Sequence, residues 1–230
     1  MNIGGLDAFS LIDYPGKMAA VVFAQGCNFR CPYCYNPELV LPEQYGPLLP
    51  EEKVWEFLEV RRGQLEAIVL GGGEPTLQDD LEAFLAQARR LGYATKLDTN
   101  GSCPEVLENL LKKGLLDFIA MDVKAPLCRY AEIVRAEVKT DAIQKSVRLI
   151  LQSGIDHEFR TTMVKGDLQP EDFSAMAKLV CGAQQYALQR FLPKAALVDP
   201  LYSGRESLSL EELWALAPIF LPHVQNFLAR

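Results

Sequence analysis

The stretch AAVVFAQGCNFRCPYC, residues 19–34, joins a short apolar run directly to three closely spaced cysteines. The apolar run is rich in β-branched and aromatic side chains, which is typical of a buried strand. Residues 67–75, AIVLGGGEP, repeat the arrangement, because another apolar run leads into a loop of glycines and one glutamate. The two stretches predict parallel strands that each carry a chemically active loop at the end.

The same alternation of short apolar runs and amphipathic stretches continues along the chain. The predicted strands are residues 19–24, 67–70, 94–97, 118–121, 159–164 and 186–192. The predicted helices are residues 50–64, 79–91, 104–113, 141–153 and 170–180, where Pro or acidic residues stand at several starts and glycine follows several ends. Residues 207–230 predict a final helical segment, interrupted at Pro218 and Pro222.

Strand–helix alternation predicts right-handed crossovers and a parallel sheet. About six strands are too few for a complete eight-stranded barrel of ~250 residues. We therefore expect an α/β fold, either a partial (β/α)6 TIM-like barrel or an open doubly wound sheet, with the active site at the C-terminal strand ends. No linker divides residues 1–230, so we expect a single domain with its core at about 18–193 and a C-terminal helical segment at about 207–230.

Composition excludes several classes of protein. The chain has 230 residues, of which 49% are hydrophobic and 23% charged, as in ordinary globular proteins. A net charge of −7 disfavours nucleic acid as the main partner, and no apolar run approaches the ~18 residues of a membrane span. No signal peptide is recognised, so we expect a cytoplasmic protein whose six cysteines serve thiol or metal chemistry.

The loops after the predicted strands carry most of the chemically active side chains. They are residues 27–34, 71–75, 98–101, 122–126, 160–162 and 191–193. Because the C-terminal ends of parallel strands meet at one face, we expect these loops to converge there.

Cys27, Cys31 and Cys34 form a CxxxCxxC run whose thiolates can wrap a soft metal centre. Zinc normally takes a fourth protein ligand, yet the only histidines, His157 and His223, are more readily explained as surface or packed residues. A [4Fe–4S] cluster with three protein thiolates leaves one iron open to a ligand. The run therefore favours a cluster over zinc, and simple packing of three small side chains is the least favoured reading.

The three-cysteine run with Tyr33 before its last cysteine resembles the signature of radical S-adenosylmethionine (SAM) enzymes, and the GGEP loop at residues 72–75 resembles their glycine-rich motif. More closely, SLIDYPGK, FAQGCNFRCPYCYNPELV, GGEPTLQ, LDTNG, MDVKAP and QRFLP resemble the activating proteins of anaerobic ribonucleoside-triphosphate reductase. The likeness runs from about Leu6 to Pro193. One departure is Tyr35, which stands where those proteins usually have histidine.

The resemblance implies that Cys27, Cys31 and Cys34 hold one [4Fe–4S] cluster. It implies a SAM site made of Tyr33, Gly72, Gly73, Glu74, Asp98, Asn100, Lys124, Arg160 and Leu192. Glu74 and the two glycines would hold the methionyl ammonium, the two cations its carboxylate, and Tyr33 and Leu192 the adenine. From the residues alone, the glycines equally suit a tight turn, the cations a solvated rim, and the aromatic and leucine side chains ordinary packing.

The resemblance also implies an enzyme that receives one electron from a donor such as flavodoxin or ferredoxin and cleaves SAM to methionine and a 5′-deoxyadenosyl radical. The radical would take a hydrogen atom from a glycine of a partner anaerobic ribonucleotide reductase. A radical SAM enzyme with a small-molecule substrate and a structural zinc or cluster protein are the alternatives. Cys103, Cys128 and Cys181 lack ligand spacing, so we expect them not to bind the cluster.

Overall fold

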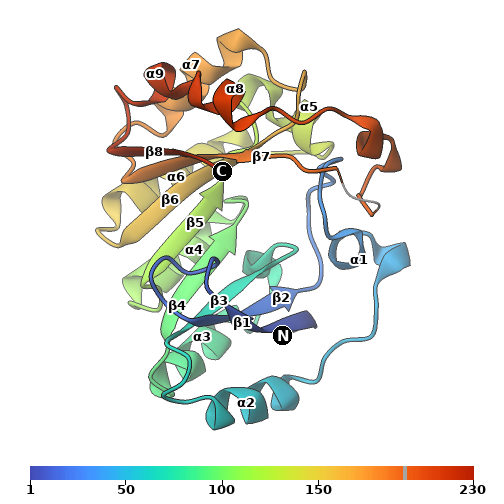
Figure 1. Ribbon diagram of the computed structural model, residues 1–230. Coiled ribbons are helices and arrows are strands. Elements are labelled where there is room, and N and C mark those ends of the chain that lie inside the picture. Colours follow the sequence, from blue (N-terminus) through green and yellow to red (C-terminus); the bar gives the residue numbers. More distant parts are fainter. Residues whose placement is uncertain (194–195) are drawn as a thin grey trace.

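The computed structural model describes residues 1–193 and 196–230, and its centre is one curved sheet of eight strands in the order β1 to β8 (Figure 1). The strand β1 pairs with β2 in the antiparallel sense, and every later pair is parallel. The strands are β1 Ile3–Ser10, β2 Ala19–Ala24, β3 Ala67–Gly72, β4 Ala94–Thr99, β5 Phe118–Asp122, β6 Asp156–Met163, β7 Gln185–Arg190 and β8 Asn226–Ala229.

Helices follow most of the parallel strands and cover the outer side of the sheet (Figure 1). They are α1 Pro37–Val40, α2 Glu51–Val60, α3 Leu81–Arg90, α4 Pro104–Lys112, α5 Tyr130–Val134, α6 Thr140–Gln152, α7 Pro170–Leu179, α8 Leu210–Trp214 and α9 Ala217–Phe220. None of the helices in the described parts of the chain is long and apolar enough to cross a membrane.

Each strand sends alternate side chains to two different cores, because successive residues of a strand point to opposite faces. On β3, Ile68 and Leu70 belong to the large core beneath the helices, whereas Ala67 and Val69 belong to a small cluster with Tyr14. That smaller cluster consists mainly of short side chains at the amino-terminal half of β2, β3 and β5. Small side chains on this face leave room for a cavity at the other end of the strands.

The six predicted parallel strands are all present, and the partial barrel is confirmed as the fold. Two strands at the edges were not predicted, namely β1 and β8. The expectation of a purely helical segment at residues 207–230 is wrong, because α8 and α9 are followed by β8. Phe227 explains the strand, since it is buried against Trp214 and Phe220 while its backbone pairs with β7.

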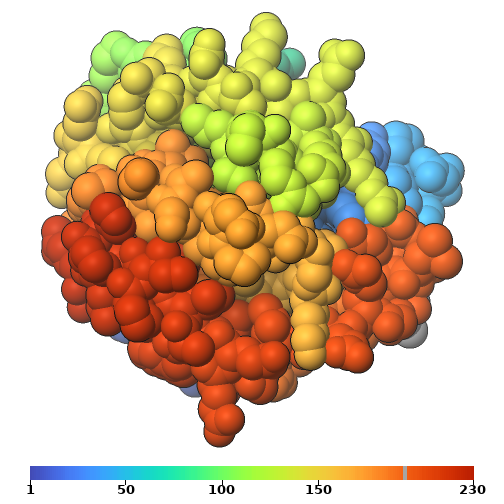
Figure 2. Space-filling view, turned by 90° about the horizontal axis from the view of Figure 1, so that it is seen from above, coloured from blue at the N-terminus to red at the C-terminus, as the bar shows by residue number. Residues whose placement is uncertain are grey.

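The segment after β7 crosses back over the loop that follows β2. The backbone N–H of Val198 donates to the carbonyl of Cys34, and that of Asp199 donates to the carbonyl of Pro32. Figure 2 shows this orange-red segment lying beside the blue part of the chain. The cysteine loop is therefore held in two ways: β2 leads directly into it, and Val198 and Asp199 donate hydrogen bonds to its backbone.

Candidate cofactor-binding site

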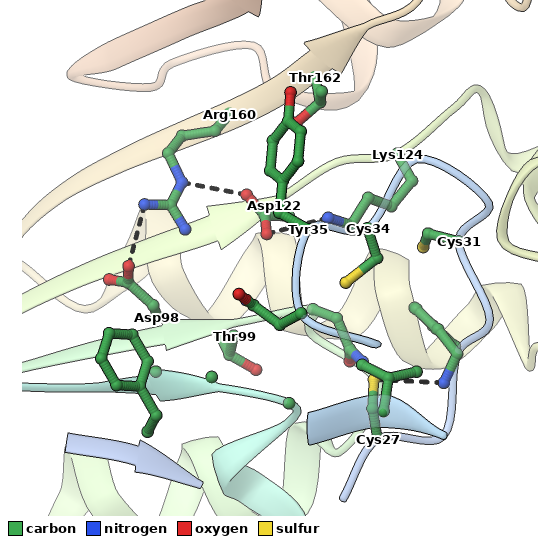
Figure 3. A pocket seen from close by; sticks show the side chains of 18 of the residues that line it. Cys27, Cys31, Cys34, Tyr35, Asp98, Thr99, Asp122, Lys124, Arg160 and Thr162 are labelled. Atoms are coloured by element: carbon green, nitrogen blue, oxygen red, sulfur yellow. Dashed lines mark hydrogen bonds and ion pairs between the residues drawn. The ribbon is translucent and has the colours of Figure 1, made fainter. Parts of the chain in front are cut away.

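A cavity of about 250 Å³ lies at the C-terminal ends of β2 to β6, where the predicted loops converge (Figure 3). All of the predicted site residues line this cavity except Glu74 and Leu192. The lining residues are Asp13, Val21, Phe23, Cys27, Phe29, Cys31, Tyr33, Cys34, Tyr35, Asn36, Val40, Gly71, Gly72, Gly73, Asp98, Thr99, Asn100, Asp122, Lys124, Arg160 and Thr162.

The three cysteines of the CxxxCxxC loop stand on one side of the cavity, opposite Asp98 and Arg160 (Figure 3). Arg30 holds the loop by donating from Nη1 to the carbonyls of Cys27 at 2.7 Å and Phe29 at 2.8 Å. Burial raises the pKa of Cys27 to about 12 and that of Cys31 to about 11. Without metal these thiols are therefore protonated at neutral pH, and cluster binding has to release their protons.

The donor set fits a cluster better than a single metal ion. Within residues 1–193 and 196–230, no three His, Cys, Asp or Glu side chains converge closely enough to hold one ion. A [4Fe–4S] cluster binds each thiolate on a different iron, so its ligands stand farther apart. All three thiols are free and face one cavity, which is the arrangement that such a cluster requires.

Glycines are needed at the end of β3 because the backbone there packs directly against the segment that leads from β2 to the cysteines. A Cβ atom at Gly73 would lie 2.1 Å from the carbonyl oxygen of Gly26, and Gly72 has a φ of 101° that favours glycine. The Gly73 N–H donates to Ala24 O at 2.8 Å. The bare backbone of Gly72 and Gly73 therefore forms part of the cavity wall.

Glu74 lies behind the cavity wall, which corrects its predicted place beside the methionyl ammonium. Its side chain is fully buried, and its carboxylate accepts hydrogen bonds from Thr99 Oγ1 at 2.6 Å, Asn100 N at 2.6 Å and Thr76 N at 3.1 Å. Burial raises the pKa of Glu74, and these donors oppose that rise. Since its lone pairs are used within the protein, Glu74 joins the loop after β3 to the loop after β4.

Five charged side chains on the concave face form an alternating chain across β4, β5 and β6. Asp98 pairs with Lys96 at 2.7 Å and with Arg160 at 3.0 Å, and Asp122 pairs with Arg160 at 3.0 Å and Lys124 at 3.0 Å. Burial alone would raise the pKa of Asp122, but attraction to the two cations outweighs it and lowers the pKa to about 2. Lys124 and Arg160 are thus held in fixed positions at the cavity wall.

Asp122, Thr99 and Tyr35 line the cavity although the sequence did not single them out as site residues. The first two stand at the ends of β5 and β4, so their strand-end position was the signal that could have identified them. Tyr35 stacks on Phe191 with ring centroids 5.8 Å apart, and its hydroxyl accepts the N–H of Leu192 at 2.7 Å. This aromatic pair links the cysteine loop to the end of β7.

Leu192 does not line the cavity, contrary to its expected place against the adenine, and its side chain is 46% exposed. Tyr33 is buried in the wall, and its hydroxyl has no hydrogen-bond partner among the residues that the structure describes. Such a buried hydroxyl can accept or donate a bond to a bound molecule.

The remaining candidate ligands lie outside the cavity. Cys128 and Cys181 are exposed, Cys103 is half-buried, and none of them lines it. His157 is packed, with Nδ1 3.0 Å from Ile155 O and Nε2 accepting the N–H of Gln184 at 3.3 Å.

Comparison with known proteins agrees with this arrangement. The sequence profile of the radical SAM superfamily matches residues 21–180. The chain is 36% identical over 234 residues to a provisionally named glycyl-radical enzyme activating enzyme of Methanocaldococcus jannaschii, covering 99% of this chain and 95% of that protein. It is 31% identical over 139 residues to the pyruvate formate-lyase-activating enzyme of Streptococcus mutans, covering 53% of this chain and 50% of that one.

Among solved structures, Streptococcus suis SuiB bound to the precursor peptide SuiA superposes with a TM-score of 0.69 at 14% identity. The match covers 91% of this chain but only 48% of the SuiB chain, and at this identity it supports the fold alone. The family profile and the full-length relative together lead to one conclusion. The chain belongs to the radical SAM superfamily.

Proposed function

We propose that this radical SAM enzyme activates a glycyl-radical enzyme, with an anaerobic ribonucleotide reductase as the partner. The observation that carries the proposal is that three free thiols and a fixed pair of cations line the same cavity at the strand ends. The relative from Methanocaldococcus jannaschii that matches 99% of the chain is provisionally named as a glycyl-radical enzyme activating enzyme. We further propose a cytoplasmic location, where cysteines stay reduced.

Cys27, Cys31 and Cys34 would hold a single [4Fe–4S] cluster as thiolates. When bound and reduced by a donor such as flavodoxin or ferredoxin, the cluster supplies the electron that splits SAM into methionine and a 5′-deoxyadenosyl radical. The protein's part is to position SAM and to exclude water. Nine of the 21 described lining residues lie on the strands β2 to β6, which suits that task.

The charged chain gives SAM a defined orientation. Lys124 and Arg160 would receive its carboxylate, because both cations line the cavity and are fixed by Asp122. Asp98 and Asn100 offer acceptors for the ammonium or ribose groups. The backbone of Gly72 and Gly73 would take the place next to the ammonium that Glu74 cannot reach, and the unpartnered hydroxyl of Tyr33 would face the adenine side.

The open sheet supports a polypeptide substrate. Strands β1 and β8 are its two edges, and no pairing joins them in the described parts of the chain. A loop of a partner protein could therefore approach from the side rather than only along the barrel axis. The fold itself does not select this function, since radical SAM proteins of different activities share it.

A small-molecule substrate is the second candidate, and Tyr35 favours it. This side chain lines the cavity where the similar activating proteins usually have histidine, so the contact to the substrate differs from theirs. A structural zinc or cluster protein is a weaker third candidate, because a purely structural metal site does not require ion-paired side chains such as Lys124 and Arg160 along a cavity.

The test uses holoenzyme reconstituted anaerobically, SAM, and a partner reductase deuterated at its target glycine. We expect deuterium in the 5′-deoxyadenosine, faster SAM cleavage with the partner, and a glycine-centred radical by electron paramagnetic resonance. A partner with that glycine replaced by alanine is the control and should give no radical. Turnover of a small metabolite without deuterium transfer from any candidate partner protein would contradict the proposal and support the second candidate.

A further inference from the structure

A lysine is buried beneath the cavity and has no part in the chemistry described above. Lys96 lies on β4 and is only 2% exposed, and it does not line the cavity. Ala94, Lys96 and Asp98 alternate along the strand on its concave face, so the ammonium sits one layer below Asp98. Removing an ammonium from water costs several kcal/mol unless it gains close partners, so its contacts require an explanation.

One partner of Lys96 is the carboxylate proposed to contact SAM. The ammonium lies 2.7 Å from Asp98 Oδ1, and Arg160 donates to Asp98 Oδ2 at 3.0 Å. Oδ1 is buried and accepts no hydrogen bond from the residues described, so the ion pair with Lys96 is the contact that balances its charge. Asp98 is therefore held by a cation on each oxygen. Loss of the Lys96 ammonium would leave its carboxylate free to rotate.

The other partner is a loop far away in the sequence. Lys96 Nζ donates to the backbone carbonyl of Asp13 at 2.5 Å, across 83 residues of sequence, and lies 5.7 Å from the centre of the Phe118 ring. Asp13 belongs to the connection between β1 and β2, and it lines the cavity. The single ammonium thus contacts two separate segments of the cavity wall.

That connection is itself a compact turn. Ser10 Oγ accepts the N–H groups of Ile12 and Asp13 and donates to Asp13 Oδ2 at 2.5 Å. The next residue, Tyr14, packs into the small cluster on the concave face, with its ring 5.8 Å from that of Phe118. The turn therefore contributes Asp13 to the cavity wall, and Lys96 is the charged group that joins the turn to β4.

We propose that Lys96 is a positioning residue for SAM, which orients Asp98 from below and fixes the turn at residues 10–14 beside the cavity. The inference rests on the proposed binding of SAM in this cavity. Its effect on SAM is indirect, because Lys96 acts only through Asp98 and the turn. A neutral side chain of similar length should therefore preserve the cluster and the fold while loosening the SAM site.

The first experiment compares Lys96→Met with wild type and with Arg89→Met. Arg89 on α3 pairs with Asp117 at 2.6 Å, and Asp117 accepts the N–H of Thr95 on β4, so loss of Arg89 tests general weakening near β4. Binding of radiolabelled SAM to anaerobically reconstituted protein is measured by equilibrium dialysis, with iron content as the check on the cluster. We expect an affinity loss of roughly ten- to a hundredfold for Lys96→Met, with unchanged iron, and less than about twofold for Arg89→Met.

The second experiment separates positioning from a purely structural role. If Lys96 acts partly through Asp98, the double variant Lys96→Met, Asp98→Asn should lose less SAM affinity than the product of the two single losses. In the metal-free protein, chymotrypsin should cleave after Phe9 or Leu11, at the start of this turn, faster in Lys96→Met than in wild type or Arg89→Met. Should Lys96→Met not fold, Lys96→Gln replaces it, because its amide can still donate to the carbonyl of Asp13.

The outcomes are distinct. Unchanged SAM affinity in Lys96→Met, fully multiplied losses in the double variant, or unchanged cleavage after Phe9 and Leu11 would each overturn the positioning role while leaving the proposed function intact. Failure of the wild-type holoenzyme to bind SAM would instead overturn the proposed function, and the positioning role with it.

Discussion

Arg160 Nη1 lies 3.0 Å from Asp98 Oδ2, and this contact joins the middle of β6 to the end of β4 across the intervening strand. The Nε atom of the same guanidinium donates to Asp122 on β5, so one side chain connects three strands. In this partly buried setting, each charge is balanced by a neighbour of opposite sign. Removing any member leaves another uncompensated, which makes the chain a sensitive target for mutation.

Lys124→Met should weaken SAM binding while leaving the cluster in place. The ammonium of Lys124 lines the cavity and is oriented by Asp122 at 3.0 Å. Loss of one charge-assisted hydrogen bond of about 1.5–3 kcal/mol corresponds to a roughly ten- to more than a hundredfold lower affinity. Equilibrium dialysis with labelled SAM measures it. The control is Lys145→Met, on the surface of α6, which should bind SAM like wild type; equal affinity in both variants would remove Lys124 from the site.

The charge chain also predicts how stability depends on pH. The pKa of Asp122 is lowered to about 2, since Arg160 and Lys124 outweigh its burial. A carboxylate with a depressed folded pKa stabilises the protein fully above its unfolded value near 3.8 and loses that contribution as pH falls through the folded value. The contribution is on the order of 2 kcal/mol.

Urea unfolding of wild type and Asp122→Asn tests this pH dependence. The difference between their free energies of unfolding should be constant from pH 7 to about 4.5 and should shrink as pH falls from about 4 toward 2. A difference that grows on acidification would mean that the carboxylate is not stabilised by its two cations.

The sequence predicts those parts of the molecule that depend on local pattern and strand-end position. The parallel strands follow from apolar runs, and the cavity follows from the rule that strand ends of one sense share a face. Cys27 and Arg160 line this one cavity, although they are far apart in the sequence. The edge strand β8 escaped prediction because four residues after a proline-interrupted helical stretch carry little periodic signal.

The differences within the site concern the direction in which side chains point in the folded chain. Glu74 follows two cavity-lining glycines, but its side chain turns toward donors on Thr99 and Asn100, 25 and 26 residues later. Lys96 was not among the predicted site residues, and its contacts with Asp13 and Asp98 form only in the folded chain. Neither direction is encoded in spacing along the chain.

Glu74→Ala should destabilise the protein rather than act on SAM directly. The substitution leaves the buried donors of Thr76, Thr99 and Asn100 without their acceptor, which should lower the free energy of unfolding by on the order of 3 kcal/mol. Urea unfolding of the metal-free protein measures it. The control is Glu82→Ala, whose exposed carboxylate pairs with Lys113 and whose loss should leave the free energy of unfolding close to that of wild type. Equal stability of the two variants would contradict the joining role of Glu74.

Cys27→Ser, Cys31→Ser and Cys34→Ser should each prevent assembly of a complete [4Fe–4S] cluster. A serine oxygen is a poor replacement for thiolate on iron, and none of the described residues that line the cavity is a fourth cysteine that could substitute for a lost ligand. Matched controls are Cys103→Ser, Cys128→Ser and Cys181→Ser, which lie outside the cavity and should load like wild type.

Iron and sulfide content and the visible charge-transfer absorption after anaerobic reconstitution measure cluster loading in all six variants. Because burial keeps the thiols of Cys27 and Cys31 protonated at neutral pH, loading of wild type should also improve as pH rises from about 7 to 8.5. Loss of the cluster in a control variant would add that cysteine to the ligand set. A full cluster in all three CxxxCxxC variants would place the iron elsewhere and remove the basis for SAM cleavage in this cavity.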